Sequence, residues 1–236
     1  MNARLNVNGF DVDAYFDDAA IRNLFLPLLR DLTRRQRELN RRLVVLLSAP
    51  PGAGKSTLAT FLEQLSRSDP QLTPVQALGM DGFHFHQDYI LSHFIGDTPM
   101  RLLKGTPGSF NVSKLRQALE DLSVKDILFP LYDRNLHDVV EDAIRVTAPI
   151  VLVEGNWLLL DRPEWNLPGD LRIFIDADEA LLNRRLIERK MRGGASLEEA
   201  EMHYARADGP NIRLCRECRR HADITLSMIG DGTYSR

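Results

Sequence analysis

The sequence contains, between residues 43 and 57, the run Leu43-Val44-Val45-Leu46-Leu47-Ser48-Ala49-Pro50-Pro51-Gly52-Ala53-Gly54-Lys55-Ser56-Thr57. An apolar stretch leads into a glycine-rich turn, and a helical pattern begins directly after it. This order of strand, turn and helix is typical of a loop that binds the phosphates of a nucleoside triphosphate together with Mg²⁺. Backbone N–H groups and the positive end of the helix dipole would surround the phosphates.

The sequence assigns separate roles to the residues of this loop. Lys55 is expected to reach the β- and γ-phosphates, and the Ser56 hydroxyl is expected to bind Mg²⁺. One position departs from the usual G-x-x-x-x-G-K-[ST] pattern, because Ala49 stands where the first glycine belongs. The expected nucleotide-binding residues are Pro51, Gly52, Ala53, Gly54, Lys55, Ser56 and Thr57.

The composition is that of an ordinary globular domain. The 236 residues are 44% hydrophobic and 27% charged, and the net charge of −3 gives no electrostatic reason to expect binding to nucleic acid or to a membrane. No apolar run approaches the ~20 residues of a membrane span, and we see no signal peptide. Cys215 and Cys218 alone make neither a disulfide framework nor a zinc ribbon. We therefore expect a single domain in the cytoplasm, with two ordinary thiols.

Short apolar runs alternate with helical patterns, which indicates an α/β fold with a parallel sheet covered on both faces. The five expected strands are 43–47, 75–80, 150–153, 171–175 and 222–226, and the main helices are 57–66, 112–122, 179–191 and 197–207. An N-terminal extension, residues 1–42, is expected to be helical from about Asp17 to Arg41. A homodimer through this helix is an option that the sequence leaves open. Residues 83–110 read as a binding loop, and residues 127–132 as part of an inserted hairpin.

Two carboxylates follow strands directly and are expected beside the phosphate loop. Asp81 ends the second strand and could accept a proton from a substrate hydroxyl, although it could instead cap a turn with Gly82. Glu154 ends the third strand and could hold metal-bound water or the Ser56 hydroxyl, although it could be an ordinary strand-end residue. Ligands bind beyond the carboxyl ends of parallel strands, so both side chains should face one crevice. His84, two residues before His86, is a candidate for substrate hydrogen bonding.

Basic and polar segments supply the remaining candidates. Arg185, Arg189 and Arg192 recur at helical spacing before Gly193-Gly194 and suggest a lid over the γ-phosphate, although a solvated face would look the same. Tyr132 and Arg134 could contact a substrate. Asn211, in a turn-rich stretch expected to end a helix, could contact the nucleotide base.

Taken together, these motifs resemble those of P-loop kinases of the uridine kinase, pantothenate kinase and phosphoribulokinase superfamily. Within it, the chain is most similar to bacterial proteins described as fructose transport system kinases or nucleoside kinases. The resemblance runs from about Leu43 to Leu214, and its motifs are Ala49–Thr57, Asp81–Phe85, Gly105–Phe110, Pro130–Arg134, Glu154–Trp157, Arg184–Arg192 and Asp208–Asn211.

The resemblance implies a three-layer α/β/α sandwich with a small helical lid, at about residues 184–207, on a kinase core of residues 43–229. It also implies an enzyme that transfers the γ-phosphoryl group of ATP, with Mg²⁺, to a small-molecule hydroxyl. Asp81 takes the general-base position and Glu154 the Walker B position. His84, Tyr132 and Arg134 line the acceptor site, where a sugar and a nucleoside are both open options. A regulatory NTPase without an acceptor is the alternative, and no Asn-Lys-x-Asp guanine-reading motif occurs.

Overall fold

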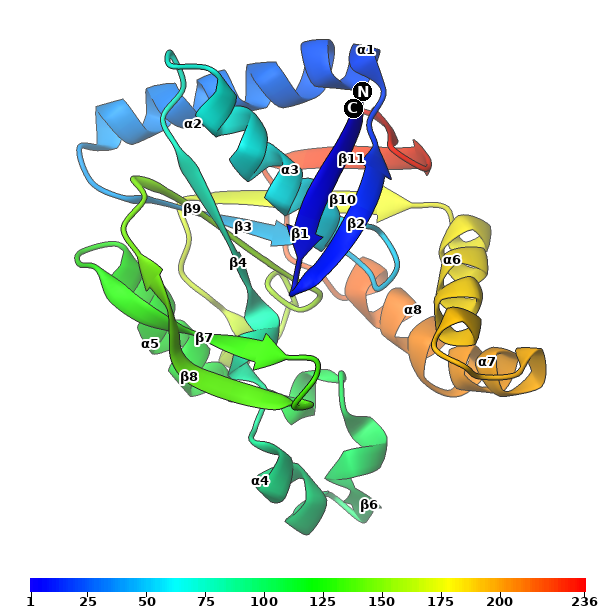
Figure 1. Cartoon of the computed structure of the whole chain (residues 1–236). Helices are drawn as coiled ribbons and strands as arrows, with labels where there is room; N and C mark the ends of the chain where they lie inside the picture. Colours follow the sequence, from blue (N-terminus) through cyan, green and yellow to red (C-terminus); the bar gives the residue numbers. More distant parts are fainter.

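The computed structural model describes all residues, 1–236. Its centre is a six-stranded sheet with the order β12-β11-β10-β3-β9-β4 (Figure 1). All neighbouring pairs are parallel except β11 and β12, which are antiparallel. The strands are β3 (Leu43–Ser48), β4 (Val75–Gly79), β9 (Ile150–Gly155), β10 (Leu171–Ala177), β11 (Ile224–Gly230) and β12 (Thr233–Ser235). The five expected strands are confirmed, and the sheet gains β12 at its edge.

Helices cover both faces of the sheet, which confirms the three-layer α/β/α arrangement. Every residue of β3 is buried, as expected for a central strand with two covered faces. Val45 and Leu47 join the core under α2 and α3, whereas Val44 and Leu46 join the core on the opposite face with α5. The helices are α1 (Asp18–Ala20), α2 (Leu26–Leu39), α3 (Lys55–Ser68), α4 (Gln87–Ser92), α5 (Val112–Leu122), α6 (Glu179–Arg192), α7 (Leu197–His203) and α8 (Gly209–Glu217). None of them is long and apolar enough to cross a bilayer.

Two π-helical turns keep helices continuous where prolines would be expected to break them. The turn Ile21–Phe25 joins α1 to α2 just before Pro27, and the turn Tyr204–Asp208 joins α7 to α8 just before Pro210. The wider i→i+5 pattern accommodates a residue that has no N–H to donate. Residues 206–211 are therefore helical, and the expectation of a turn that ends the helix there was wrong.

The N-terminal extension is not helical throughout. Strands β1 (Asn2–Val7) and β2 (Phe10–Tyr15) form an antiparallel hairpin that lies across α3 in Figure 1. Ala3, Leu5 and Phe16 are buried in the core on this face, and the Phe16 ring stacks on Phe61 with a centroid distance of 3.9 Å. The hairpin is thus an integral part of the packed structure.

The region between β4 and β9 is more ordered than the sequence suggested. Residues 83–110 contain α4 and a small hairpin of β5 (Phe94–Ile95) and β6 (Thr98–Pro99), where we expected a loop. The inserted hairpin is confirmed, with strands β7 (Ile127–Asp133) and β8 (Asp138–Val146). Gly82 packs so closely on the Pro130 backbone that a Cβ atom would overlap it, and this contact fixes the inserted hairpin beside the end of β4.

Replacing Phe16 with alanine should lower the free energy of unfolding by about 3–5 kcal/mol, because the ring is fully buried and stacked. Phe10→Ala on the same hairpin should change it by about 0.5 kcal/mol or less, since Phe10 is 48% exposed. Urea denaturation of both variants measures the difference. Equal effects would show that the hairpin is not anchored through Phe16.

Candidate active site

The loop between β3 and α3 has the backbone that phosphate binding requires. Gly52 and Gly54 have φ angles of 84° and 70°, in the left-handed region that favours glycine, and Gly54 caps the start of α3. Ala49 is fully buried and is not among the residues with positive φ. The alanine in place of the first glycine is therefore compatible with the loop conformation, and the N-terminus of α3 is free to receive an anion.

The hydroxyl of Ser56, at the start of α3, meets the carboxylate of Glu154, at the end of β9. Ser56 Oγ donates a 2.7 Å hydrogen bond to Glu154 Oε1, and Glu154 is only 7% exposed. The parallel register of β3 and β9, with Leu47 opposite Glu154, brings the two together. A hydroxyl and a carboxylate oxygen beside a phosphate loop are the donor set that Mg²⁺ takes in nucleotide sites, so these residues fit the ion.

Burial imposes an electrostatic penalty on the ionised form of Glu154. Burial raises its pKa, and nearby Asp81 adds to this, while Lys55, the Ser56 hydrogen bond and Arg134 act in the opposite direction. The net result is a pKa above the usual range for a glutamate. A cation bound next to Glu154 would relieve this penalty, because an opposite charge favours the ionised form.

Asp81 lies one strand away, in a short 3₁₀ turn (Met80–Phe83) that follows β4. Its side chain is 47% exposed, and its carboxylate oxygen lies 3.7 Å from the Arg134 guanidinium. Arg134 follows β7 directly, so the inserted hairpin supplies this partner. The turn leaves the carboxylate accessible to a ligand, which a general base requires.

His84 and Tyr132 lie next to one another beyond Asp81. The His84 ring stacks on Phe110 at 3.8 Å and meets the Tyr132 ring edge-on at 5.6 Å. Burial lowers the pKa of His84 more than Asp81 raises it, so the imidazole is neutral at pH 7. Lys104 Nζ donates a 2.8 Å hydrogen bond to the Tyr132 hydroxyl. Sequence reasoning missed Lys104, which directly precedes the identified motif Gly105–Phe110.

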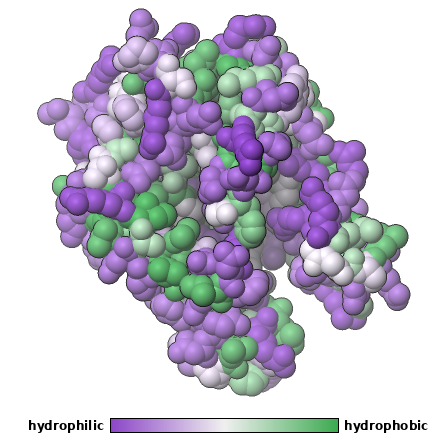
Figure 2. All heavy atoms as spheres, in the orientation of Figure 1, coloured by the Kyte–Doolittle hydropathy of each residue, from purple (hydrophilic) through white to green (hydrophobic).

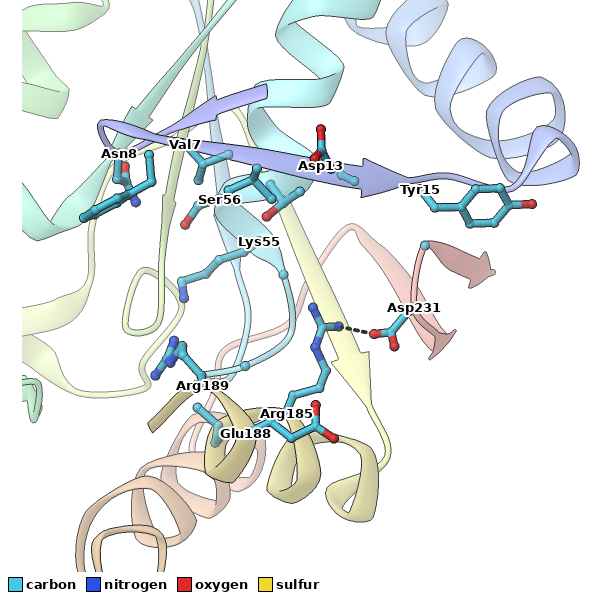
Figure 3. Close-up of a pocket in the computed structure, with 18 of the residues that line it drawn as sticks. Val7, Asn8, Asp13, Tyr15, Lys55, Ser56, Arg185, Glu188, Arg189 and Asp231 are labelled. Atoms are coloured by element: carbon cyan, nitrogen blue, oxygen red, sulfur yellow. Dashed lines mark ion pairs between the residues drawn. The ribbon is translucent and has the colours of Figure 1, made fainter. Parts of the chain in front are cut away.

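The arginines of α6 face the phosphate loop across a cavity of about 590 Å³ (Figure 3). Arg185, Arg189 and Arg192 all line this cavity together with Gly52, Lys55 and Arg134. Arg185 lies 3.5 Å from Asp231 in the turn between β11 and β12. Desolvation in the cleft, opposed by Asp208 and reinforced by Arg134, lowers the pKa of Arg189. A cavity with this many cations is suited to a polyanionic ligand.

Several predicted site residues are not part of the lining of this cavity: Pro51, Ala53, Asp81, His84, Tyr132, Glu154 and Asn211. Asn211 is part of α8 and does not line the cavity. His84 and His86 both line a separate depression beside α4, where His86 Nε2 lies 3.0 Å from Glu141 Oε1. Cys215 is buried and donates to the Asn156 carbonyl oxygen, and burial raises its pKa to about 12, which keeps the thiol protonated at pH 7.

Sequence reasoning missed one whole wall of the cavity. The β1–β2 hairpin contributes Val7, Asn8, Phe10, Val12, Asp13, Ala14 and Tyr15. In Figure 2, hydrophilic residues border the recess between this part of the molecule and the lobe formed by α6 and α7. The sequence does contain a signal for this hairpin. Asn8-Gly9 lies between two segments that alternate polar and apolar residues, and this pattern is a strong indicator of a two-residue hairpin turn.

The fold and this arrangement of residues define a P-loop kinase. The comparisons with known proteins agree with this. The chain is 44% identical over 238 residues to the uncharacterized protein YggC of Escherichia coli K12, covering 99% of this chain and 98% of YggC. It therefore belongs to the same family as YggC, within the P-loop kinases of the uridine kinase and pantothenate kinase type. No protein-family model matches the chain.

More distant relatives carry kinase names. A "Putative uridine kinase" of Schizosaccharomyces pombe is 27% identical over 80% of this chain and 84% of its own length. A pantothenate kinase of Lactococcus lactis is 29% identical over 62% of this chain, but the match spans only 49% of that enzyme.

Solved structures show the same fold. The "putative fructose transport system kinase" of Silicibacter sp. TM1040 has 29% identity and a TM-score of 0.72, covering 84% of this chain and 98% of that one. YFH7 of Saccharomyces cerevisiae, at 17% identity and a TM-score of 0.72, covers 88% of this chain and 99% of its own and shares the fold.

The raised pKa of Glu154 gives a stability prediction. When the pKa of a carboxyl group is higher in the folded state than in the unfolded chain, the protein loses stability as the pH rises through the folded-state pKa. In EDTA, Glu154→Gln should therefore be more stable than the wild type at pH 7–8, by roughly 0.5–2 kcal/mol, and this gain should shrink at low pH. Calorimetric melting at several pH values measures it.

Glu141→Gln is the matched control for this experiment. Burial acts to raise the pKa of Glu141, but hydrogen bonds from Lys114 and His86 outweigh it and leave this pKa lowered. The control should therefore show no gain in stability at pH 7–8. A loss of stability in Glu154→Gln at neutral pH would contradict the assigned penalty.

Proposed function

We propose that this small-molecule kinase transfers the γ-phosphoryl group of ATP, with Mg²⁺, to a hydroxyl group of a sugar or a nucleoside. The observation that carries the proposal is the convergence of the phosphate loop, Glu154 and Asp81 at the ends of β3, β9 and β4. These strands are direct neighbours in the sheet, with β9 in the middle. The predicted nucleotide site and the candidate base therefore lie at the same edge of the sheet, where ligands of such sheets bind.

The nucleotide would bind along the loop at Pro51–Thr57. The positive φ angles of Gly52 and Gly54 turn backbone N–H groups toward the phosphates, and Lys55 neutralises charge on the β- and γ-phosphates. A Cβ atom on Gly52 would lie 3.0 Å from Leu186, so glycine also lets α6 approach the loop closely. Asn211, in α8, is not part of the cavity lining, and its contact with the nucleotide base stays a prediction.

Ser56 and Glu154 would hold Mg²⁺, with the Ser56 hydroxyl as a ligand and Glu154 binding the ion directly or through a water molecule. Bound there, the ion would offset negative charge on the β- and γ-phosphoryl oxygens. The Ser56 hydroxyl now donates to Glu154, so it must turn its lone pair toward the ion when the site fills.

In the transfer step, Asp81 accepts the proton of the acceptor hydroxyl. The acceptor oxygen forms a bond to the γ-phosphorus while the bond from that phosphorus to the β,γ-bridging oxygen breaks, and the electron pair leaves with ADP. Arg134, 3.7 Å from Asp81, would hold this carboxylate in position next to the acceptor. Arg185, Arg189 and Arg192 neutralise the charge on the transferred group, as part of a lid at about residues 184–207.

The acceptor would lie against residues 83–110 and the β7–β8 hairpin. His84 is neutral and can both donate and accept a hydrogen bond, and Tyr132 and Arg134 supply further polar contacts. The names of the Silicibacter protein and of the Schizosaccharomyces protein support a sugar and a nucleoside, respectively. Both acceptors offer hydroxyl groups that this polar wall could orient.

A regulatory NTPase without an acceptor is the alternative function. It would need the phosphate loop and Glu154 but no base directed at a substrate hydroxyl. The accessible carboxylate of Asp81, held beside Arg134, therefore favours the kinase.

Lys55→Ala should reduce turnover by about 10²–10³-fold or more, because it removes a cation that stabilises the charge of the transferred phosphoryl group. The rate of ADP formation from ATP·Mg²⁺ measures the effect. Lys125→Ala is the control, since Lys125 is a surface residue paired with Asp121. Full activity in Lys55→Ala would rule out the phosphate loop as the site of reaction.

Asp81→Asn should leave ATP affinity unchanged and slow phosphoryl transfer by ~10²–10⁴-fold, the range of general-base catalysis. ADP release across a panel of sugars, nucleosides and pantothenate, for the wild type and this variant, measures it and identifies the acceptor class. Asp121→Asn is the surface control. Slow ADP release that depends neither on any acceptor nor on Asp81 would favour the regulatory NTPase.

A further inference from the structure

The N-terminal hairpin runs along the length of the nucleotide cavity. Its last residues lie at the β11–β12 end, where the Asp17 N–H donates a 2.9 Å hydrogen bond to the Gly232 carbonyl oxygen. Its turn lies at the other end, near β4, and Figure 3 shows Asn8 and Val7 on the far side of Lys55 and Ser56 from α6. The hairpin thus spans the cavity from the side of Asp231 to the side of the predicted acceptor.

The hairpin is fixed at its base and free at its turn. The Met1 ammonium donates to the Phe16 carbonyl oxygen at 2.8 Å, the Phe16 N–H donates to Met1 at 2.9 Å, and the Phe16 ring is stacked in the core. The turn residue Gly9 has open space around it, and neighbouring Phe10 is 48% exposed. This arrangement holds the turn in place over the cavity without burying it.

The side chain of Asn8 is the polar group that this turn offers to the cavity. The side-chain hydrogen bonds within the hairpin join Arg4 and Asn6 to Asp11, and they leave the Asn8 amide unpaired. Gly79, at the end of β4, lies between the Asn8 side chain and Glu154. A Cβ atom on Gly79 would lie 4.0 Å from Asn8 Oδ1 and 3.5 Å from Glu154 Oε1. The Asn8 amide therefore approaches the same point as the carboxylate predicted to hold Mg²⁺.

We infer that the Asn8 side-chain amide donates a hydrogen bond to the γ-phosphate of the bound nucleotide. The inference rests on the proposed function, because it takes the cavity to be an ATP site. Lys55 and Arg189 line the cavity from the loop and from α6, and Asn8 lines the opposite wall, where its amide would add a neutral donor (Figure 3). With the hairpin in place, the γ-phosphoryl end of the nucleotide is also shielded from water, which suppresses transfer to water.

The asparagine suits this turn, but the turn does not require its side-chain amide. Asn8 and Gly9 have φ angles of 53° and 86°, as in a type I′ turn, and glycine or aspartate can also occupy the first position. Asn8→Gly therefore preserves the hairpin and removes only the amide. Asn8→Asp also preserves the hairpin but places a negative charge where the γ-phosphate is expected.

The test is calorimetric titration with a non-hydrolysable ATP analogue and with ADP, both with Mg²⁺. Asn8→Gly should weaken binding of the analogue about 10–100-fold, the range for a hydrogen bond to a charged group, and leave ADP binding unchanged. Asn8→Asp should weaken binding of the analogue further, and this loss of affinity should be smaller at high salt, because salt screens the repulsion between the two negative charges. Asn6→Ala, on the same hairpin but hydrogen-bonded to Asp11, is the control and should bind both like the wild type.

Three outcomes would contradict the inference, and they are distinguishable. Unchanged binding of the analogue in Asn8→Gly and Asn8→Asp would remove Asn8 from the site, while wild-type nucleotide binding would leave the proposed function intact. An equal loss of ADP affinity in Asn8→Gly would mean that the turn shapes the cavity and does not contact the γ-phosphate. A wild-type protein that binds neither nucleotide would overturn the proposed function, and this inference with it.

Discussion

The hydrogen bond from Ser56 to Glu154 connects the two parts of the molecule on which the site depends. It joins the first turn of α3 to the end of β9, and the parallel register of β3 with β9 makes it geometrically possible. Packing at the end of β9 buries this carboxylate almost completely, at an energetic cost that the raised pKa of Glu154 reports and that the Ser56 hydrogen bond partly offsets. A site that is unfavourable when empty and favourable when filled is a common compromise between stability and activity.

Close packing around the crevice follows from small residues at a few positions. Gly52 lets Leu186 of α6 approach the phosphate loop, and Gly82 lets the Pro130 backbone approach the turn that carries Asp81. Helix α6 and the inserted hairpin thus pack closely against the elements that carry the phosphate loop and Asp81. The N-terminal hairpin completes the enclosure from the third side, with its base fixed by Phe16 in the core. Each wall of the cavity comes from a different part of the chain.

The sequence predicted the centre of the fold better than its periphery. The phosphate loop and the five parallel strands were predictable, because buried strands are continuous apolar runs and the loop needs glycines at fixed spacing. The hairpin of residues 2–15 was missed although both of its strands alternate polar and apolar residues around Asn8-Gly9, so the signal for it was present in the sequence. Helix continuity through Pro210 was also missed, because a π turn has no recognisable sequence pattern. The set of side chains that line the cavity depends on packing between segments far apart in the sequence. Local sequence patterns do not predict such long-range contacts.

The most direct test of the account follows the oxygen atoms of the γ-phosphate. The wild-type protein is incubated with Mg²⁺, ATP labelled with ¹⁸O in the three terminal γ-oxygens, and a mixture of sugars and nucleosides, and the products are analysed by mass spectrometry. A kinase acting through this crevice gives a phosphorylated acceptor that carries all three labelled oxygens, and the mass identifies the acceptor. Label found only in inorganic phosphate, whichever acceptors are present, would show transfer to water and contradict the assignment of Asp81 as the base for a substrate hydroxyl.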